Sequence, residues 1–325
     1  MKILILIVFI SITLFSCDNT QKDLLLNVNG KPGEIVVVIE KNTWTMSPGK
    51  QLKRILTTVQ PALPQDEPMF RVYHIEPSNF SVLFKSNRNI IYVEKGDFKD
   101  SATIHLKYDV WAKPQAYIEI NAPSDSELTT LIMNNEDKII DFFITSERKR
   151  MQATYNTFKE KEITSKLLKH HVNLTFPKGY KIDVDSLGFV WITSETPNIS
   201  QGVFIYEYNY RDTNTFTAKY IIQKRDSILK RFVPGQLPET YMTTEHDYVP
   251  YVNEFFLNGT YTFELRSLWK VQNDFMGGPF VSLSTVDEKR NKVITVEGYV
   301  YAPKYDKLEY VRQIEAILYT LEVVN

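Results

Sequence analysis

Apolar and polar positions alternate along the chain in two rhythms, one of period two and one near 3.6, which predict strands and helices. The run at 35–39 is apolar throughout and predicts a strand that is covered on both faces. Ser47 and Pro48 are typical of a helix start, and apolar residues then recur at helical spacing as far as Val59. Further strands are predicted at 70–75, 80–84, 90–93, 103–107 and 116–120.

A helix that covers this first sheet is predicted to begin at Ser124. Ser124 and Glu127 have the spacing of a capping box. Apolar residues from Leu128 to Phe143 then form one stripe, and the basic cluster at 147–150 is expected in a second helix or in a continuation of the first. We place a boundary near 165–170, which gives an N-terminal α/β mixed domain at 31–167 and a C-terminal domain at 168–325.

The second half begins again with strands and adds two helices. Strands are predicted at 171–176, 180–184, 188–193, 202–210, 249–257, 259–271, 278–286 and 293–301. Aromatic residues at every second position of 204–210 predict an aromatic row on one face, and Asn258-Gly259 predicts a tight hairpin. Helices are expected at 217–232 and after Pro303.

The order of these elements predicts an α+β protein of two mixed domains. In the C-terminal domain, helices pack on an antiparallel sheet. This order is similar to that of the PsbP-like, or Mog1-like, α/β/α sandwich, an analogy that implies no function.

The N-terminus has the pattern of an exported lipoprotein. Lys2 is followed by an apolar, charge-free stretch at 3–15, which is too short to span a bilayer but matches a secretory signal peptide. The segment Leu14-Phe15-Ser16-Cys17 resembles the bacterial lipobox. That resemblance implies cleavage before Cys17, transfer of a diacylglycerol to its thiol and acylation of the new amine. We therefore expect a signal peptide at 1–16 and a lipidated flexible tether at 17–30; the alternative is a buried N-terminal strand or helix with an incidental cysteine.

Composition narrows the functional classes. The chain has 38 Lys and Arg against 39 Asp and Glu, a net charge of -1, so nucleic acid is not expected as a partner. Cys17 is the one cysteine, which leaves no cysteine pair for a structural disulfide and no thiolate metal site. The chain must therefore be stabilised by burial of its core.

Several motifs accompany the lipobox in a recognisable order. They are the early strand at 33–39, the segment Trp269…Met276-Gly277-Gly278-Pro279-Phe280, and the closing segments Tyr299-Val300-Tyr301-Ala302-Pro303 and Tyr310-Val311-Arg312-Gln313-Ile314-Glu315-Ala316-Ile317-Leu318. Together they resemble an uncharacterised family of Bacteroidota lipoproteins, the domain-of-unknown-function family 4837. The resemblance covers nearly the whole chain and implies a location in the envelope but no reaction.

Candidate catalytic groups are few. The five histidines show no metal-ligand spacing, so neither a metal nor a cofactor is expected. Glu245-His246-Asp247 is the best acid/base candidate, although a solvated polar loop is the simpler interpretation. The segment 276–279 lacks the lysine and helix of a phosphate loop and is interpreted as a tight or bulged turn.

Binding residues are suggested by the aromatic side chains. The four tryptophans and the row at 206–210 would stack on sugars or peptide side chains if they lined one exposed concave face, and otherwise they pack within sheets. The basic cluster at 148–150 would touch lipid headgroups or an acidic partner, although a solvated helix face is the simpler interpretation.

These observations predict a protein held in the bacterial cell envelope by lipid on Cys17. We expect a non-enzymatic accessory or binding protein whose partner is an envelope protein or a glycan. The alternative is a lipid-anchored hydrolase or transferase of an unrecognised type that uses His246 and Asp247, and a lectin-like binder is the third hypothesis.

Overall fold

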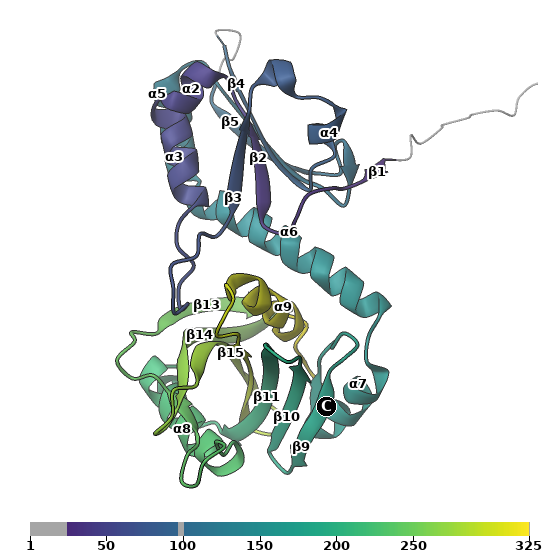
Figure 1. Ribbon diagram of the computed structural model, residues 1–325, viewed down its shortest axis with the longest axis vertical. Helices are drawn as coiled ribbons and strands as arrows, with labels where there is room; N and C mark the ends of the chain where they lie inside the picture. Colours follow the sequence, from purple (N-terminus) through teal and green to yellow (C-terminus); the bar gives the residue numbers. More distant parts are fainter. Residues whose placement is uncertain (1–24, 97–100, 325) are drawn as a thin grey trace, which may run out of the picture.

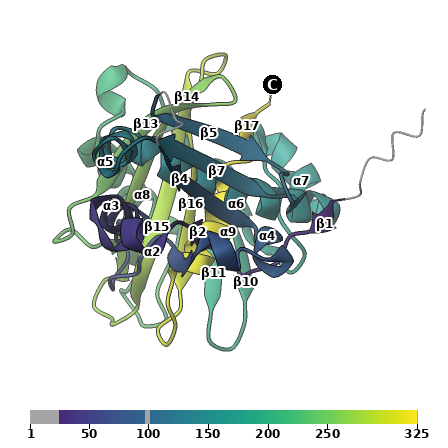
Figure 2. The same ribbon diagram turned by 90° about the horizontal axis from the view of Figure 1, so that it is seen from above.

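Two β-sheets, one from each half of the chain, are stacked along the long axis of the computed structural model, which describes residues 25–96 and 101–324 (Figure 1). The view along that axis shows the strands of the first sheet lying over the second half (Figure 2). Helix α6 (Glu136–Thr157) runs between the sheets. Helices and strands are both abundant and the second sheet is antiparallel, so the fold is α+β, as predicted.

The first sheet has five strands in the order β3-β2-β4-β7-β5, and all neighbours run parallel except β7 and β5. The strands are β2 (Glu34–Val38), β3 (Arg71–Ile75), β4 (Asn89–Lys95), β5 (Thr103–Tyr108) and β7 (Ala116–Ala122). The apolar run predicted at 35–39 forms β2 and the residue after it, and all five of its residues are buried. A strand between two parallel neighbours needs apolar side chains on both faces, which explains the unbroken run.

Helices cover one face of the first sheet. Short α2 (Lys41–Thr45) leads into α3 (Ser47–Leu56), which packs on this face together with α5 (Asp125–Asn134) and α6. The opposite face carries a thinner layer, in which Phe80 packs on a small cluster of buried side chains of β2, β4 and β7. The helices therefore shield one face more deeply than the other.

The segment 80–84, predicted as a strand, is helical instead. The 3-10 helix η1 (Pro77–Asn79) leads into α4 (Val82–Lys85), where the N–H groups of Phe84 and Lys85 both donate to the carbonyl oxygen of Ser81 at 3.0 Å. Its backbone groups are thus satisfied locally rather than by a neighbouring strand. Val82 and Leu83 are 68% and 67% exposed, so these two apolar residues of the predicted strand do not face the core.

The long apolar stripe at 128–143 is divided between two helices. Ser124 caps α5 as predicted: its Oγ accepts from the N–H of Glu127 at 3.2 Å and donates to that residue's carboxylate at 2.8 Å. The helix ends at Asn134, because the side chain of Asn135 donates to the carbonyl oxygen of Leu131 at 2.8 Å and competes with the next helical turn. The second helix therefore begins before the basic cluster, which lies inside α6.

The second sheet has eight antiparallel strands in the order β12-β14-β15-β16-β11-β10-β9, with β13 also paired to β14. The strands are β9 (Lys181–Ser186), β10 (Phe189–Glu195), β11 (Ser200–Asn209), β12 (Met242–Thr244), β13 (Tyr251–Leu257), β14 (Thr260–Val271), β15 (Gly277–Asp287) and β16 (Lys292–Tyr301). The predicted hairpin is confirmed: Asn258 and Gly259 both have positive φ angles, 51° and 82°, as a two-residue turn of this type requires.

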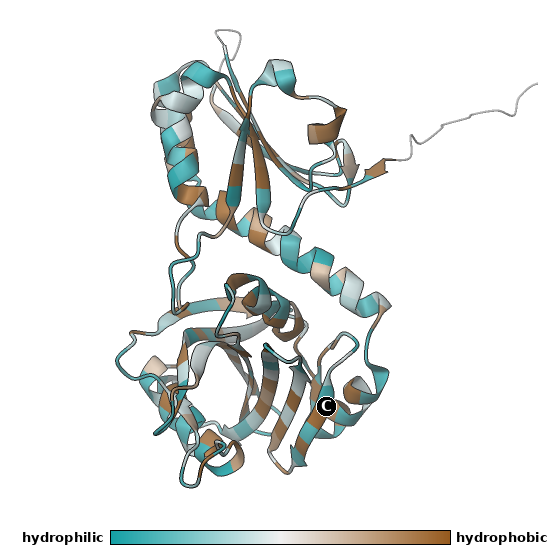
Figure 3. Ribbon diagram, in the orientation of Figure 1, coloured by the Kyte–Doolittle hydropathy of each residue, from teal (hydrophilic) through white to brown (hydrophobic). Residues whose placement is uncertain are grey.

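Both faces of the second sheet are covered by helices. Helices α7 (Lys161–Leu167) and α9 (Leu308–Leu318) pack on one face, and α8 (Ala218–Phe232) packs on the other. The predicted aromatic row is confirmed in part, since Phe204, Tyr206 and Tyr208 all belong to the α8 side. The second half is thus a three-layer sandwich of helices, sheet and helix. Hydropathy colouring shows apolar and polar residues alternating along several of its strands (Figure 3).

Helix α9 lies very close to the sheet and starts later than predicted. A Cβ at position 298 would lie 1.8 Å from the side chain of Ile314, so only glycine fits beneath this helix. The helix begins at Leu308 rather than after Pro303, because the carboxylate of Glu67 accepts from the N–H groups of Lys307 and Leu308 at 2.7 and 2.9 Å. The start of α9 is therefore set by a residue of the first half.

Other contacts also hold the two halves together. Helix α6 packs on α9, and Gln152 donates to the carbonyl oxygen of Ala316 at 3.2 Å. The hydroxyl of Tyr248 accepts from the N–H of Ala62 at 2.7 Å. Each sheet nevertheless has its own core. The predicted domain boundary at 167/168 stays a prediction.

Short strand pairs close the ends of the described chain. Strand β1 (Leu26–Asn27) pairs in parallel with β6 (Ala112–Lys113), and β8 (Val172–Asn173) pairs with β17 (Glu322–Val323). Two 3-10 turns, η2 (Leu168–His170) and η3 (Thr213–Thr215), complete the elements. Residues 26–29 are bonded to the first half, so this part of the predicted tether is not free. The part at 17–24, with Cys17, and the signal peptide lie outside the described residues.

Candidate binding site

An aromatic pocket of about 480 Å³ opens at one end of the second sheet. We call this the aromatic pocket and define it by four rings and two loops: Trp191, Trp269, Tyr299 and Tyr301, with the turn 195–200 and the segment 233–236. The rings come from β10, β14 and β16, which are not all neighbours in the sheet. The curl of the sheet brings them to one concave surface.

Hydrogen bonds fix the orientation of these rings. Trp191 Nε1 donates to the hydroxyl of Tyr299 at 3.2 Å, and Trp269 Nε1 donates to the carbonyl oxygen of Val300 at 3.2 Å. Trp269 meets Tyr299 edge to face, with centroids 5.6 Å apart. Trp269 and Tyr299 are buried and form the floor, whereas Trp191 and Tyr301 are half-buried walls. Both indole N–H groups and the hydroxyl of Tyr299 thus have partners within the protein.

Glycines make room for the floor of the pocket. A Cβ at Gly202 would lie 2.2 Å from the ring of Tyr299, and one at Gly278 would lie 2.1 Å from the carbonyl oxygen of Val300. Gly277 and Gly278 begin β15, so the segment 276–279 is the start of a strand rather than the predicted turn. The turn precedes it at 272–275, and the glycines instead allow close packing between strands.

The mouth of the pocket is polar but carries little charge. Asn198 and Gln236 are exposed at the rim, and Met242 and Met276 add apolar surface. Glu195 is the one acidic side chain among the lining residues. Burial raises the pKa of Tyr299 to about 12, so its phenol stays neutral at physiological pH. Rings surrounded by amides and hydroxyls suit a neutral ligand that has an apolar face and polar edges.

The structure separates the residues that the sequence suggested for stacking. Trp191 and Trp269 both line the aromatic pocket, but Trp269 is buried, so the accessible rings are Trp191 and Tyr301, and a lectin-like role stays a prediction. Trp44 stacks instead on His74, with centroids 4.9 Å apart, and Trp111 lies under Lys85 in the first half. Tyr206 is buried in the core of the second half.

The acid/base candidate lies at the surface. The His246 side chain is 63% exposed, and its Nε2 lies 3.0 Å from a carboxylate oxygen of Asp226. Asp247 is exposed, and its N–H donates to the carboxylate of Glu245 at 3.3 Å. Neither His246 nor Asp247 is among the residues that line the aromatic pocket. Their placement fits a polar surface loop, and a catalytic role for them stays a prediction.

The remaining histidines and carboxylates do not assemble a metal centre in the part of the chain that the structure describes. His74 Nε2 lies 2.9 Å from the carbonyl oxygen of Ile39, and His170 Nε2 lies 2.8 Å from Asp185. His171 has a φ angle of 60°, which turns the chain between the two neighbouring histidines. These partners account for the two rings structurally.

Sequence reasoning missed a buried ion pair on the α8 side of the second sheet. Arg225 and Glu297 are both fully buried, with Nη2 and a carboxylate oxygen 2.8 Å apart. Tyr206 donates to the same carboxylate at 3.2 Å, and the guanidinium of Arg225 lies 3.9 Å from the ring centre of Phe280. The signal was present: Arg225 lies between Ile221 and Leu229 at helical spacing, inside the apolar stripe of α8.

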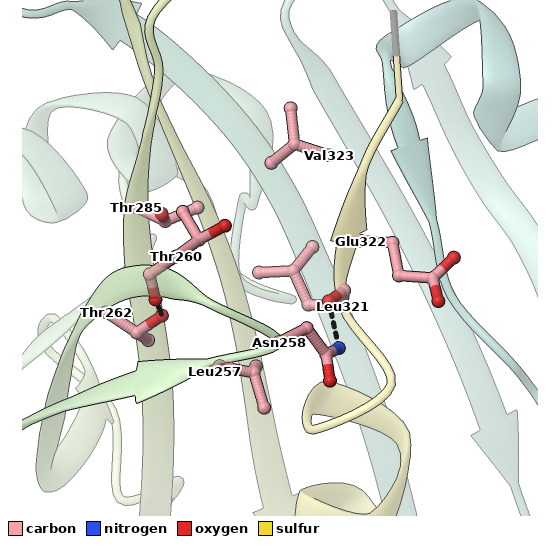
Figure 4. A pocket seen from close by; sticks show the side chains of 8 residues that line it. All are labelled: Leu257, Asn258, Thr260, Thr262, Thr285, Leu321, Glu322 and Val323. Carbon is pink, nitrogen blue, oxygen red and sulfur yellow. Dashed lines mark hydrogen bonds between the residues drawn. The ribbon is translucent and has the colours of Figure 1, made fainter.

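A second pocket of about 260 Å³ lies between the β13–β14 turn and β17 (Figure 4). Three of its eight lining residues are threonines. Thr262 donates to the carbonyl oxygen of Thr260 at 3.1 Å, and Thr285 donates to that of Tyr261 at 2.7 Å. The side chain of Asn258 donates to the carbonyl oxygen of Leu321 at 3.3 Å, as the dashed line shows. The Asn258 bond ties the hairpin to the C-terminal segment, and the two threonine hydroxyls bond to carbonyl oxygens of β14, so these polar groups already have partners.

Comparison with known proteins identifies two families of unknown function. Residues 156–320 match the family model described as Domain of unknown function (DUF4837), and residues 28–156 match Domain of unknown function (DUF8532). No curated protein matches the sequence. Among solved structures, LpqN, described as involved in cell envelope biogenesis of Mycobacterium tuberculosis, is similar at 13% identity and a TM-score of 0.30. The similarity covers 47% of this chain and 83% of LpqN.

Proposed function

The chain belongs to the DUF4837 family, and we propose that it is a membrane-anchored accessory lipoprotein of the bacterial cell envelope that binds an envelope glycan through the aromatic pocket. The observation that carries the binding role is the convergence of Trp191, Trp269, Tyr299 and Tyr301 on one concave surface with a neutral polar rim. Sugars present apolar C–H faces and hydroxyl edges, and these match ring faces and amides respectively.

The anchor is supported by the leader and by Leu14-Phe15-Ser16-Cys17. In residues 25–96 and 101–324, no helix combines the length and apolar character needed to span a membrane. Two or three acyl chains on Cys17 would hold the protein durably, because each buried methylene contributes about 0.8 kcal/mol. The lipid would thus supply the attachment and the folded halves the binding.

The rim of the pocket supports a binding role further. The loops that contribute Gln236 and Met276 also carry Leu237 and Phe275, which are 58% and 106% exposed. Exposed apolar side chains beside a pocket extend the surface available to a ligand. A glycan strand longer than the pocket would contact these two side chains as well.

The anchor is tested by analysing protein recovered from membranes of its native host. We expect mass spectrometry to find a mature N-terminus at Cys17 that carries acyl chains. A Cys17→Ala variant should leave the membrane fraction, because its cysteine can no longer accept lipid. An intact leader or an unmodified thiol at this position would refute the anchor.

The pocket is tested by calorimetric titration with a tetrasaccharide of N-acetylglucosamine. We expect saturable binding that weakens at least about tenfold in Trp191→Ala, equivalent to about 1.4 kcal/mol. Trp111→Ala is the matched control, since Trp111 is a partly exposed tryptophan outside the pocket. Thermal unfolding of both variants shows whether each remains folded. Binding that is absent in the wild type, or equal in the wild type and Trp191→Ala, would contradict glycan recognition by the pocket.

A further inference from the structure

An exposed apolar surface lies in the first half, where the described chain begins. It consists of Leu25, Leu26, Val82, Leu83 and Trp111, which are 40%, 59%, 68%, 67% and 43% exposed. We call this surface the N-terminal apolar face. Hydropathy colouring shows α4 and β1 in brown on the side where the chain enters (Figure 3). An apolar cluster of this kind on a protein surface usually marks an interaction site.

Hydrogen bonds join the segments of this face into one unit. Strand β1 pairs with β6, where Leu26 lies opposite Ala112. The side chain of Asn29 donates to the carbonyl oxygen of Leu83 at 3.1 Å and to the hydroxyl of Ser86 at 2.7 Å. These bonds connect the entering chain to α4, so the exposed side chains hold fixed positions relative to one another.

Cations accompany the apolar residues. The Nζ of Lys85 lies 4.4 Å from the ring centre of Trp111, and Lys113 is exposed in β6. Tryptophan is enriched where protein crosses from hydrocarbon to headgroup, and lysine extends its ammonium toward lipid phosphates from the same depth. Exposed aliphatic side chains, a tryptophan and lysines together match the chemistry of a phospholipid surface.

The position of the entering chain adds a geometric argument, which rests on the proposed lipid anchor. The chain from Cys17 to Leu25 spans at most about 28 Å when fully extended. A folded body of roughly 300 residues is about 50 Å across, as its expected radius of gyration implies. Lipid on Cys17 would therefore keep the Leu25 side of the protein near the bilayer.

We propose that the N-terminal apolar face rests on the phospholipid bilayer that carries the lipid anchor, with Val82, Leu83 and Trp111 inserted into the interfacial region. The chain enters on one flank of the first half, and α4 and β1 lie on that same flank, so it is this flank that faces the bilayer (Figure 1). The aromatic pocket lies in the second half and shares no residue with this face.

The test uses the full lipidated chain in vesicles of phosphatidylethanolamine and phosphatidylglycerol. Cys17 is the one native cysteine, so after its lipidation an introduced cysteine is the only free thiol. An environment-sensitive dye is attached in Leu83→Cys and, as the matched control, in Phe256→Cys, whose native side chain is 74% exposed in the second half. We expect the dye at 83 to shift to the blue, brighten several-fold and be quenched by spin-labelled lipid, whereas the dye at 256 keeps its emission in water.

The outcomes separate this proposal from the anchor itself. Flotation of the protein with the vesicles while the dye at 83 stays in water would overturn the docking face and leave the anchor intact. Equal insertion of both dyes would overturn the orientation. Failure of the protein to float would refute the lipid anchor and, with it, the docking that rests on it.

Discussion

The two halves of this protein build their sheets by different means. In the first half, the centre of the parallel sheet packs against helices through aliphatic and aromatic side chains, and Ile35, Ile91 and Ile118 are fully buried. A buried charge of this half, Glu147, pairs with Arg88 and lies at the end of the sheet where β4 begins. In the second half, both faces of the antiparallel sheet bury charged groups: Arg225 and Glu297 under α8, and Arg266 with Glu315 under α9.

This difference explains why the candidate site lies in the second half. An apolar face can fill its volume completely, and the helix-covered face of the first sheet does so with isoleucine, leucine and phenylalanine. Buried charges and large rings need partners in fixed directions, because an unpaired charge in the interior is very costly. The second sheet meets this need with tyrosine, tryptophan and glycine, and the same residue types shape the aromatic pocket.

The sharpest test of the comparison removes a buried charge. We expect Arg225→Met to destabilise the protein by about 3–5 kcal/mol, because Glu297 would stay buried without its partner. The free energy of unfolding in urea measures the effect. The double variant Arg225→Met with Glu297→Leu should recover much of the loss, since it removes both charges. A single variant as stable as the wild type would show that the second half does not depend on this pair.

Acid should affect the other ion pair of the second half. Burial alone would raise the pKa of Glu315, but Arg266, Arg148 and Arg312 outweigh it and hold that pKa below its ordinary value of 4.5. The stabilisation is therefore complete above about pH 4.5 and is lost as pH falls through the lower pKa of the folded state. We expect Glu315→Gln to cost about 1–3 kcal/mol at pH 7.

The deficit of the same variant relative to the wild type should narrow as pH falls below 4.5, because the wild type loses the charge of Glu315 as pH falls through the lowered pKa of the folded state. Urea unfolding at a series of pH values measures this convergence. Asp137→Asn, on the exposed surface of α6, serves as the control for a change of carboxylate to amide. A deficit that stays constant with pH would show that the charge of Glu315 contributes nothing.

An apolar substitution in the first half should have a smaller effect. Ile118 is fully buried in β7, and Ile118→Val removes one methylene group from a close-packed core. We expect a loss of about 0.5–1.5 kcal/mol, independent of pH between 4 and 8 because no ionisable group is altered. The free energy of unfolding at several pH values checks both statements. A loss of stability that changes strongly with pH would mean that ionisable groups contribute to the effect of this substitution.

The smallest effect is expected from a surface ion pair of the first half. Lys107 donates a hydrogen bond to Glu119 and holds the pKa of that carboxylate below its ordinary value, but the two side chains are 47% and 26% exposed. We expect Lys107→Ala to cost less than about 1 kcal/mol. The cost should shrink further in high salt, because mobile ions screen an exposed pair. A larger, salt-independent cost measured by urea unfolding would contradict the description of Lys107 and Glu119 as a weak surface ion pair.

Local sequence patterns were sufficient to predict the elements that depend on residues close together in the chain. Period-two alternation predicted the strands of the second half, and Asn258-Gly259 predicted its hairpin because positive φ angles favour these residues. The prediction was wrong at 80–84, where apolar side chains face solvent, and it missed the break at Asn135 within one apolar stripe. At both places local hydrogen bonds decide the secondary structure. The hydropathy pattern contains no information about these bonds.

The candidate site was only partly predictable. The sequence indicated that tryptophans would bind a ligand if they converged, but nothing in their spacing showed that Trp191 and Trp269 would meet while Trp44 and Trp111 would not. That choice depends on the curl of the second sheet and on glycines such as Gly202, whose lack of a side chain admits the ring of Tyr299. The Arg225–Glu297 pair was signalled by Arg225 alone, since its partner lies 72 residues away.

The sequence by itself determined the predicted export signal, the order of strands and helices and the α+β class, because each depends on neighbours within a few residues. The tertiary structure decided which rings share a pocket, which charges are buried together and where α9 begins. These depend on contacts between distant segments, such as the carboxylate of Glu67 at the start of α9. These particular side chains meet their partners only when the second sheet curls and the two halves pack together.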